Sequence, residues 1–293
     1  MLILLGALYN LSLPYWDTLK IRLAKSRISS LTIIDAPNLV GHPIGIIILL
    51  ALGLFTLPTD PTFYLSWFGM IVLSSFSLVL QIWGLLKTKF LGEEIIWKLG
   101  FLMSSLAAIL LLGEQVTEMQ AIAMGIATLA ILFFAWPKQI TKTSFTLDKG
   151  VLFVVLALFI DAFSTILYKN AALHASTYEA FLTGRFVGDL VGWTIVWVVG
   201  LVFVSKLNPL KELRRCIQSP GGKWMIVGVA ATNIIDSFLI YKLPVVTFAI
   251  LGTLIIPSAF LFSRFKYGET MTRHMWIGTG LGIMATLLFF YPA

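Results

Sequence analysis

The chain has 293 residues, of which 58% are hydrophobic and only 12% are charged, and its formal net charge is +7. A mean hydropathy of +0.93 excludes a soluble domain, whose surface must carry far more charge. The basic residues are scattered over short segments between apolar stretches and form no long solvated arm, so we expect the lipid bilayer and no nucleic acid as a partner.

Ten apolar stretches follow one another along the chain, each near the about 20 residues that a helix needs to cross a bilayer. Their continuity favours helices over a barrel, whose strands would be about ten residues long with alternating polarity. The first stretch has no basic leader and no small-residue cleavage site, which indicates a retained span. We predict an all-α polytopic membrane protein, multi-pass in the plasma or inner membrane. The predicted spans are 2–20, 38–57, 64–86, 94–113, 118–136, 150–172, 181–205, 223–243, 245–265 and 275–291.

Lysine and arginine follow the odd-numbered spans and therefore fall on one predicted side of the membrane. The positive-inside rule makes that side cytoplasmic and would put both termini outside. The residues are Lys20, Arg22, Lys25, Arg27, Lys87, Lys89, Lys98, Lys138, Lys142, Lys149, Lys206, Lys211, Arg214, Arg215, Lys223, Arg264, Lys266 and Arg273.

An internal repeat divides the chain into two five-span halves, residues 1–137 and 150–292. The segments "LLLGEQVTEMQAIAMG" (110–125) and "FKYGETMTRHMWIGTG" (265–280) align without a gap at an offset of 155 residues. The same offset pairs Gln81 with Asp236. Because each half has an odd number of spans, the second half enters the membrane from the opposite face, and the predicted repeat is inverted.

The duplicated "GE-x-x-T" block and the stretch "YKLPVVTFAILGTLIIPSAFLFSRFKYGE" (241–269) resemble the EamA-type members of the drug/metabolite transporter superfamily. The resemblance covers the whole chain and is strongest over residues 85–136 and 236–291. It implies a ten-helix 5+5 fold, alternating access through a central cavity, and cytoplasmic termini, which conflicts with the basic-residue pattern and leaves orientation open. Two features depart from the family pattern. The first half has the charged stretch "GEEIIWKLG" where the second half has the apolar "VVTFAILG", and Pro257 has no counterpart in the first half.

Polar residues interrupt the sixth predicted span, in "LFIDAFSTILYKN" (158–170). Asp161, Ser164, Thr165 and Tyr168 recur at helical spacing and form one stripe. A carboxylate near the bilayer centre costs about 3 kcal/mol, so Asp161 is a candidate for substrate binding or proton coupling. Ser164 and Thr165 are also compatible with helix–helix hydrogen bonds of about 0.6 kcal/mol. The Lys169 side chain is long enough either to reach the membrane interface or to pair with Asp161.

The eighth predicted span adds a second polar face, in "ATNIIDSFLIYK" (231–242), with Thr232, Asn233 and Asp236 at helical spacing. We predict that Asp161 and Asp236 point into one cavity, where burial and like charge would favour protonation of one of them. That arrangement suits a proton-coupled carrier and equally an amine or other cation site. A structural pair that shares a proton is the alternative.

The remaining candidates are weaker. Asn10 with Tyr15 and Asp17 on the first span, and Gln81 on the third, supply mostly uncharged groups to the same site. In the seventh span, Gly184, Gly188 and Gly192 form a ridge for close helix packing.

Arg185 and Asp189 stand one turn apart on that span and are predicted to pair, with Arg185 as an anchor for an anionic substrate group. We interpret His42 as a hydrogen-bonding residue. Glu114 and Glu269 are predicted to cap helix N-termini.

Three classes of function are compatible with this pattern. The leading hypothesis is a secondary carrier of a small polar or amphipathic metabolite, such as an amino acid or amine, without enzymatic activity and without a cofactor or metal. A polytopic membrane enzyme would need a catalytic constellation, for which three dispersed histidines, the single Cys216 and the missing G-x-x-x-x-G-K-[ST] loop give little basis. A scaffold or receptor is the third class. Oligomeric state, a homodimer among the options, is left open.

Overall fold

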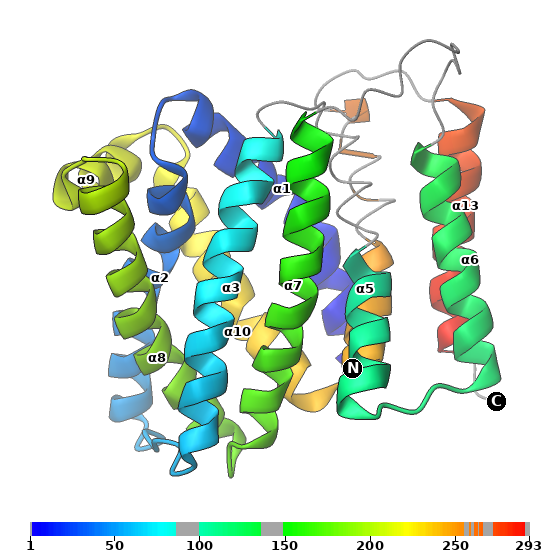
Figure 1. Cartoon of the computed structure of the whole chain (residues 1–293), viewed down its shortest axis with the longest axis horizontal. Helices are drawn as coiled ribbons and strands as arrows, with labels where there is room; N and C mark the ends of the chain where they lie inside the picture. Colours follow the sequence, from blue (N-terminus) through cyan, green and yellow to red (C-terminus); the bar gives the residue numbers. More distant parts are fainter. Residues whose placement is uncertain are drawn as a thin grey trace. The chain divides into compact units, whose positions relative to one another are not determined.

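The computed structural model describes residues 2–85, 100–135, 149–254, 258, 261–262, 264–265 and 272–290. All regular elements in these segments are helical (Figure 1). They are α1 (Leu2–Lys25), α2 (Ser30–Ala51), α3 (Pro61–Leu85), α5 (Gly100–Ala107), the π-helix η1 (Ala108–Leu112), α6 (Glu118–Ala135), α7 (Lys149–Leu173), α8 (Tyr178–Val199), the π-helix η2 (Gly200–Val204), α9 (Pro209–Gln218), α10 (Gly222–Lys242), α11 (Val245–Leu251), the 3-10 helix η3 (Gly252–Leu254) and α13 (Arg273–Phe289).

Several residues that carried sequence predictions lie outside this part of the chain. They are Lys87, Lys89, Lys98, Lys138, Lys142, Pro257, Lys266, Gly268 and Glu269, and the side chains of Asp17 and Lys149 also fall outside it.

Within the described residues, five helices are long and apolar enough to cross a bilayer, which is compatible with the predicted all-α integral membrane protein. These candidate spans lie at Ser30–Ala51, Pro61–Gln81, Val155–Leu173, Tyr178–Phe203 and Gly222–Lys242. The helix α2, at Ser30–Ala51, differs from the window 38–57 that was predicted for the second span. The helix begins eight residues earlier and ends at Ala51, because the polar, proline-containing stretch around Asp35 is helical and the apolar stretch after Gly53 is not.

The chain forms two compact units, each assembled from separate stretches of sequence. Unit 1 consists of residues 1–15, 83–162 and 244–293, and unit 2 of residues 16–82 and 163–243. Each unit therefore takes segments from both predicted halves. The unit boundaries fall inside α1, α3 and α7.

Unit 2 is built around α8, which packs on α2 and α3. Trp197 contacts Thr32 near one end of the α2–α8 pair, and Phe186 contacts Gly45 near the other, so these helices run antiparallel. A β-carbon at Gly184, Gly188 or Gly192 would lie 2.5–2.6 Å from side chains of α3, which confirms the predicted packing ridge. The start of α8 lies beside the end of α10, where the Tyr178 and Tyr241 rings are 5.4 Å apart.

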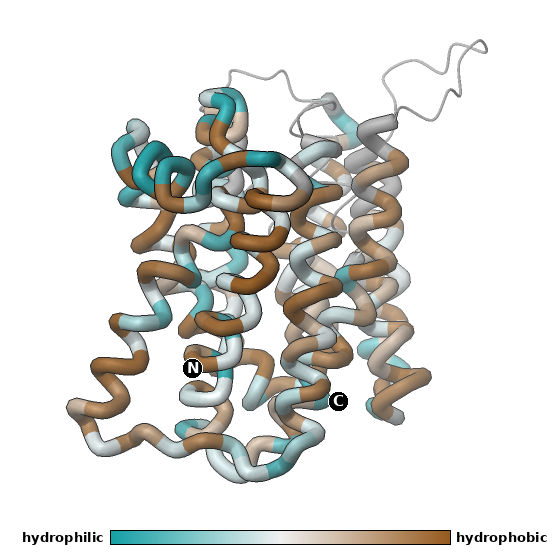
Figure 2. The backbone as a smooth tube through the Cα atoms, turned by 60° about the vertical axis from the view of Figure 1, so that its left-hand side comes forward, coloured by the Kyte–Doolittle hydropathy of each residue, from teal (hydrophilic) through white to brown (hydrophobic). Residues whose placement is uncertain are grey.

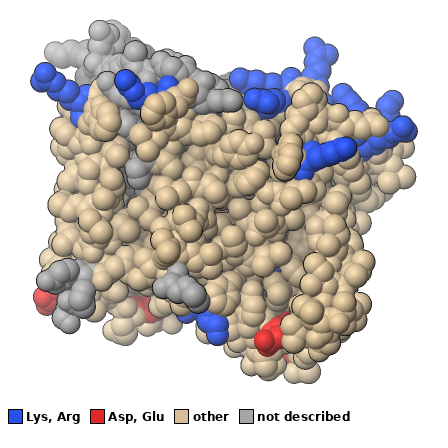
Figure 3. Space-filling view, turned by 180° about the vertical axis from the view of Figure 1, so that it is seen from behind, with Lys and Arg blue, Asp and Glu red and all other residues tan. Residues whose placement is uncertain are grey.

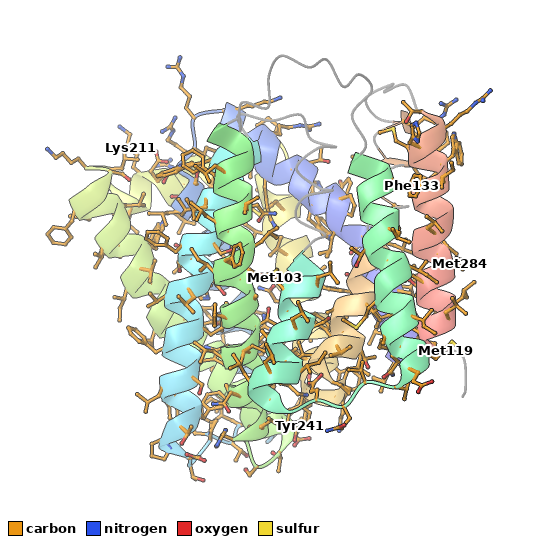
Figure 4. All side chains as sticks on the ribbon, turned by 45° about the vertical axis from the view of Figure 1, so that its right-hand side comes forward. Met103, Met119, Phe133, Lys211, Tyr241 and Met284 are labelled. Carbon is orange, nitrogen blue, oxygen red and sulfur yellow. The ribbon has the colours of Figure 1, made fainter. Side chains whose placement is uncertain are left out.

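Unit 1 is held together by small residues. In the α6–α13 pair, Ala123, Ala127, Ala130 and Ala285 are fully buried, so the two backbones approach closely. Phe133, near the end of α6, contacts His274 at the start of α13. Figure 4 shows Phe133 at the upper end of this pair, Met119 at the lower end and Met284 between them, so α6 and α13 run antiparallel.

The helix positions refine the spacing of the repeat. Residues Glu118 and Arg273 begin α6 and α13 at the predicted offset of 155, whereas Ser30 and Tyr178 begin α2 and α8 at an offset of 148. The change occurs between α8 and α10, where the chain contains the extra helix α9 and the first half has a short connection, residues 52–60. The offset of 155 therefore matches the starts of α6 and α13 but not those of α2 and α8.

Most exposed basic residues of unit 2 gather at one end of its helices, whereas Lys242 lies at the other end of α10. Leu19 of α1 lies against Gly221 before α10, and the Ser29 N–H donates to Glu212 of α9 at 3.1 Å, which brings these segments together. Figure 2 shows hydrophilic residues at this end and apolar residues along the helices. Figure 3 shows lysine and arginine side chains over the same region. Within unit 2, the predicted one-sided distribution of charge is present.

Candidate functional site

Arg185 is the centre of a buried polar cluster inside unit 2. Its helix, α8, begins where Thr177 caps it by accepting a hydrogen bond from the Ala180 N–H at 3.1 Å. Two turns later along α8 lies Arg185, of whose surface only 7% is exposed. A charged group this deep requires several partners, because burying an unpaired charge is very costly.

The partners of Arg185 come from α7, α8 and α10. Its Nε donates to Asp189 Oδ2 at 3.4 Å, one turn along α8, as predicted from the spacing. Its Nη1 donates to the Asn233 carbonyl at 2.6 Å and to Asp236 Oδ2 at 3.4 Å, and also contacts the hydroxyls of Tyr168 and Ser237. Arg185 therefore bridges two carboxylates and joins three helices.

Asp189 extends the cluster to α2 and α3. Its Oδ1 accepts a hydrogen bond from the Trp67 indole at 3.0 Å, and its Oδ2 lies 3.1 Å from His42 Nε2. The other ring nitrogen of His42 lies 2.9 Å from the Asn38 carbonyl. His42 therefore lies between the Asn38 carbonyl and the Asp189 carboxylate and links α2 to α8.

The two aspartates differ in access. The Asp189 side chain is 3% exposed, whereas that of Asp236 is 17% exposed. Asp236 is therefore the carboxylate of the cluster that a small molecule or water can reach. Asp189 holds Arg185, His42 and Trp67 in place.

Four of the predicted site residues meet in this cluster: Tyr168, Arg185, Asn233 and Asp236. Asn233 also donates through its side chain to Asn38 Oδ1 at 3.1 Å, which ties α10 to α2. Sequence reasoning had left out Trp67, Asn38 and Ser237, and had given His42 no site role. The helical spacing of Asn38 and His42 was the signal that could have found the α2 face.

The other predicted site residues lie apart from the Arg185 cluster. Asp161 and Asn10 belong to unit 1, so the predicted meeting of Asp161 with Asp236 joins residues of different units and stays a prediction. Asp161 is half-buried on α7, and Asn10 donates to the Gly6 carbonyl of its own helix at 2.8 Å. In unit 2, Gln81 is buried and Thr165 half-buried, with no hydrogen bond to the cluster.

Two neighbours of Asp161 on α7 hold helices together. Ser164 Oγ lies 2.5 Å from Ser74 Oγ of α3, which is the helix-joining alternative for this residue. Lys169 is buried, and its ammonium group donates to the carbonyls of Ile240 and Leu243, each at 2.8 Å. It thus compensates the negative end of α10.

The described residues Glu114, Thr117 and Thr272 of the duplicated "GE-x-x-T" block accept hydrogen bonds from N–H groups at helix starts. Thr117 accepts from the Gln120 N–H at 3.2 Å before α6, and Thr272 accepts from the Met275 N–H at 3.4 Å before α13. Glu114 caps as predicted, but it caps α11 of the second half. Its two carboxylate oxygens accept from the N–H groups of Val245 and Val246, at 2.7 and 2.9 Å.

Comparisons with known proteins identify the fold and leave the family open. No family model matches the chain, and no curated protein matches it. A solved crystal structure, described only as that of a protein, matches 98% of this chain and 94% of its own length with a TM-score of 0.68 and 11% sequence identity. At that identity the likeness shows the fold alone, an architecture that the chain shares over almost its whole length.

Proposed function

We propose that the protein is a secondary carrier that moves a small polar or amphipathic metabolite across a membrane by alternating access. The observation that carries the proposal is the Arg185 cluster, in which a buried arginine bridges two carboxylates inside apolar helices and one carboxylate, Asp236, remains reachable. Charged groups inside a membrane protein are costly and mark substrate or ion paths. An amine or the ammonium group of an amino acid would be attracted by Asp236, and a carboxylate by Arg185.

The arrangement of corresponding helices supports an inverted 5+5 repeat with ten spans. In unit 2, α2 and α8 run antiparallel, and in unit 1, α6 and α13 do the same. The end of η1 lies beside the start of α11, through Glu114, so α5 and α11 are antiparallel as well. Opposite directions of equivalent helices are what inversion requires. This architecture would make the chain a drug/metabolite transporter of the EamA type.

Transport by purified protein in proteoliposomes tests the proposal. Candidate substrates are selected first by tryptophan fluorescence with amines and amino acids, because Trp67 bonds to Asp189 and should report binding. We expect Trp67→Phe to lose that signal. Uptake of the selected substrate should fall in Asp236→Asn and persist in Asp60→Asn, a carboxylate in the exposed α2–α3 connection. Undiminished uptake by a folded Asp236→Asn, Asp161→Asn double variant would remove these residues from the mechanism.

Cysteine labelling tests the membrane topology. Cys216, the single cysteine, is buried, and burial beside Glu212 raises its thiol pKa to about 11, so it should stay unlabelled at neutral pH. Cysteines introduced at Arg27 and Lys211 should react from one side of the membrane, and one at Gly53 from the other. Labelling of all three from the same side contradicts the proposed topology.

A further inference from the structure

Asp35 on α2 is an aspartate that the Arg185 cluster does not use. It is fully buried, and neither carboxylate oxygen has a hydrogen-bond partner among the described residues. All other buried charged side chains in the described chain, Lys169, Arg185, Asp189 and Glu212, have partners. An aspartate would lose most of its solvation here if it were ionised.

The surroundings of Asp35 offer no counter-charge. On α2, Thr32 and His42 flank it on the same face, and they contact Trp197 and Asp189 of α8. Between those two contacts the buried residues of α8 are Gly192 and Trp193, neither of which titrates. The α8 side of Asp35 is therefore apolar.

The charged and titratable groups of the helices packed against α2 make no hydrogen bond to Asp35. On α8, Arg185 and Asp189 bond within the cluster, and on α9, Glu212 pairs with Arg215 and Ser29. On α10, Asp236 pairs with Arg185. The remaining ones are Tyr178, Glu179, Lys211, Arg214, Cys216, Lys223, Tyr241 and Lys242, and none of them hydrogen-bonds to Asp35.

We infer that Asp35 is a proton-binding site, whose carboxyl holds a proton while α2 is packed on α8 and releases it to water when that contact opens. The step is an acid–base exchange in which the carboxylic acid and a water molecule give a carboxylate and a hydronium ion. A metal ion in place of the proton would need several oxygen ligands. No group of three acidic, histidine or cysteine residues is placed to supply them in the described chain.

The α2 helix has the features that such an opening needs. Pro37 and Pro43 lie inside it, on either side of the segment that carries Asn38 and His42. Each proline removes a backbone hydrogen bond, and prolines are the usual points at which helices bend. A polar group that served packing alone could be an asparagine or be replaced by leucine at no loss of stability. A carboxyl is the group that can change its charge.

Infrared spectroscopy of the full-length protein in nanodiscs tests the site without any substrate. We expect a carboxylic acid C=O band at neutral pH that is missing in Asp35→Asn and retained in Asp60→Asn. Asp35→Glu keeps a carboxyl, so its band should persist at a shifted position. This variant decides the question even if Asp35→Asn folds poorly. A band that Asp35→Asn leaves unchanged overturns the inference. Stabilisation of the wild type, but not of Asp35→Asn, by sodium ions at constant pH also overturns it.

Coupling to transport is a second measurement, and this part rests on the proposed function. In proteoliposomes, Asp35→Asn should reduce uptake driven by a pH gradient to the rate seen without a gradient, and should keep substrate-for-substrate exchange. Uptake that still follows the gradient refutes coupling through Asp35. Absence of any transport by the wild type refutes the proposed function, while the infrared result continues to decide the proton site.

Discussion

The two units of the protein bury different kinds of residue. Among the described residues, every buried charged side chain belongs to unit 2: Asp35, Lys169, Arg185, Asp189 and Glu212. Unit 1 buries alanines, serines, threonines and Asn10, and its best-defined helix pair, α6 and α13, meets through small residues. Unit 2 instead packs aromatic side chains against a glycine ridge. In the described residues, unit 2 therefore keeps buried ionisable groups despite their cost, which supports the proposal that the site lies there.

Among the variants considered, removal of Arg185 should lower the stability of unit 2 the most. Arg185→Leu leaves Asp189 and Asp236 buried without their counter-charge, so we expect a loss of about 3–5 kcal/mol in the free energy of unfolding. Thermal unfolding in detergent measures the effect. Arg185→Lys keeps the charge but loses the forked geometry, and should fall between wild type and leucine. A leucine variant as stable as the wild type contradicts the proposed role of the cluster.

The glycine ridge provides a matched comparison between the units. An added β-carbon at Gly188 would lie 2.5 Å from the Trp67 ring, whereas one at Gly125 of α6 would meet nothing within 4 Å. Gly188→Ala should therefore cost about 1–3 kcal/mol through overpacking. Gly125→Ala should be neutral, or stabilising by up to about 1 kcal/mol, through helix propensity. Equal melting temperatures for the two variants speak against the ridge.

A smaller effect is expected for the cap that Glu114 makes inside unit 1. Glu114→Ala leaves the first two N–H groups of α11 without their acceptor and should lower stability by about 1–2 kcal/mol. Glu118→Ala, on the exposed first turn of α6, is the control. Hydrogen exchange at Val245 and Val246 should accelerate in the Glu114 variant alone, and unchanged exchange there rules out the cap.

Asp60 should give the smallest effect. Hydrogen bonds from Thr62 lower its pKa below the usual 3.8, and the side chain is exposed. Because its folded pKa is depressed, its contribution is fully present above pH 3.8 and disappears as the pH falls through the folded value. Asp60→Asn should therefore change the melting temperature slightly at neutral pH and not at all in stronger acid. A difference that grows on acidification contradicts this assignment.

Sequence patterns predicted the all-helical class and part of the polar cluster, whereas the ten spans stay a prediction. The pair of Arg185 with Asp189, the glycine ridge and the shared site of Tyr168, Asn233 and Asp236 follow from helical spacing. Asp35 was missed because its polar, proline-containing segment looked like an interhelical loop and the second span was expected to begin at residue 38. The extra helix α9 looked like a basic loop, since its length and charge give no membrane signal.

The contacts that join Arg185 to α7 and α10, and Asp189 to the Trp67 indole, could not be predicted, because they depend on which helix faces meet. The spacing on each helix defines a stripe, but not the rotation that brings one stripe against another. The starts of α2 and α8 lie 148 residues apart, a spacing that an alignment anchored on the "GE-x-x-T" block does not show.

Thr117 and Thr272 begin α6 and α13 by the same local bond, and that bond involves no group of the Arg185 cluster. The threonines of the duplicated block thus serve the local structure of the helix starts. If the proposed carrier function holds, substitutions on α2, α8 and α10 can change the substrate while the block stays as it is, and chains that share the block would share a fold and differ in substrate.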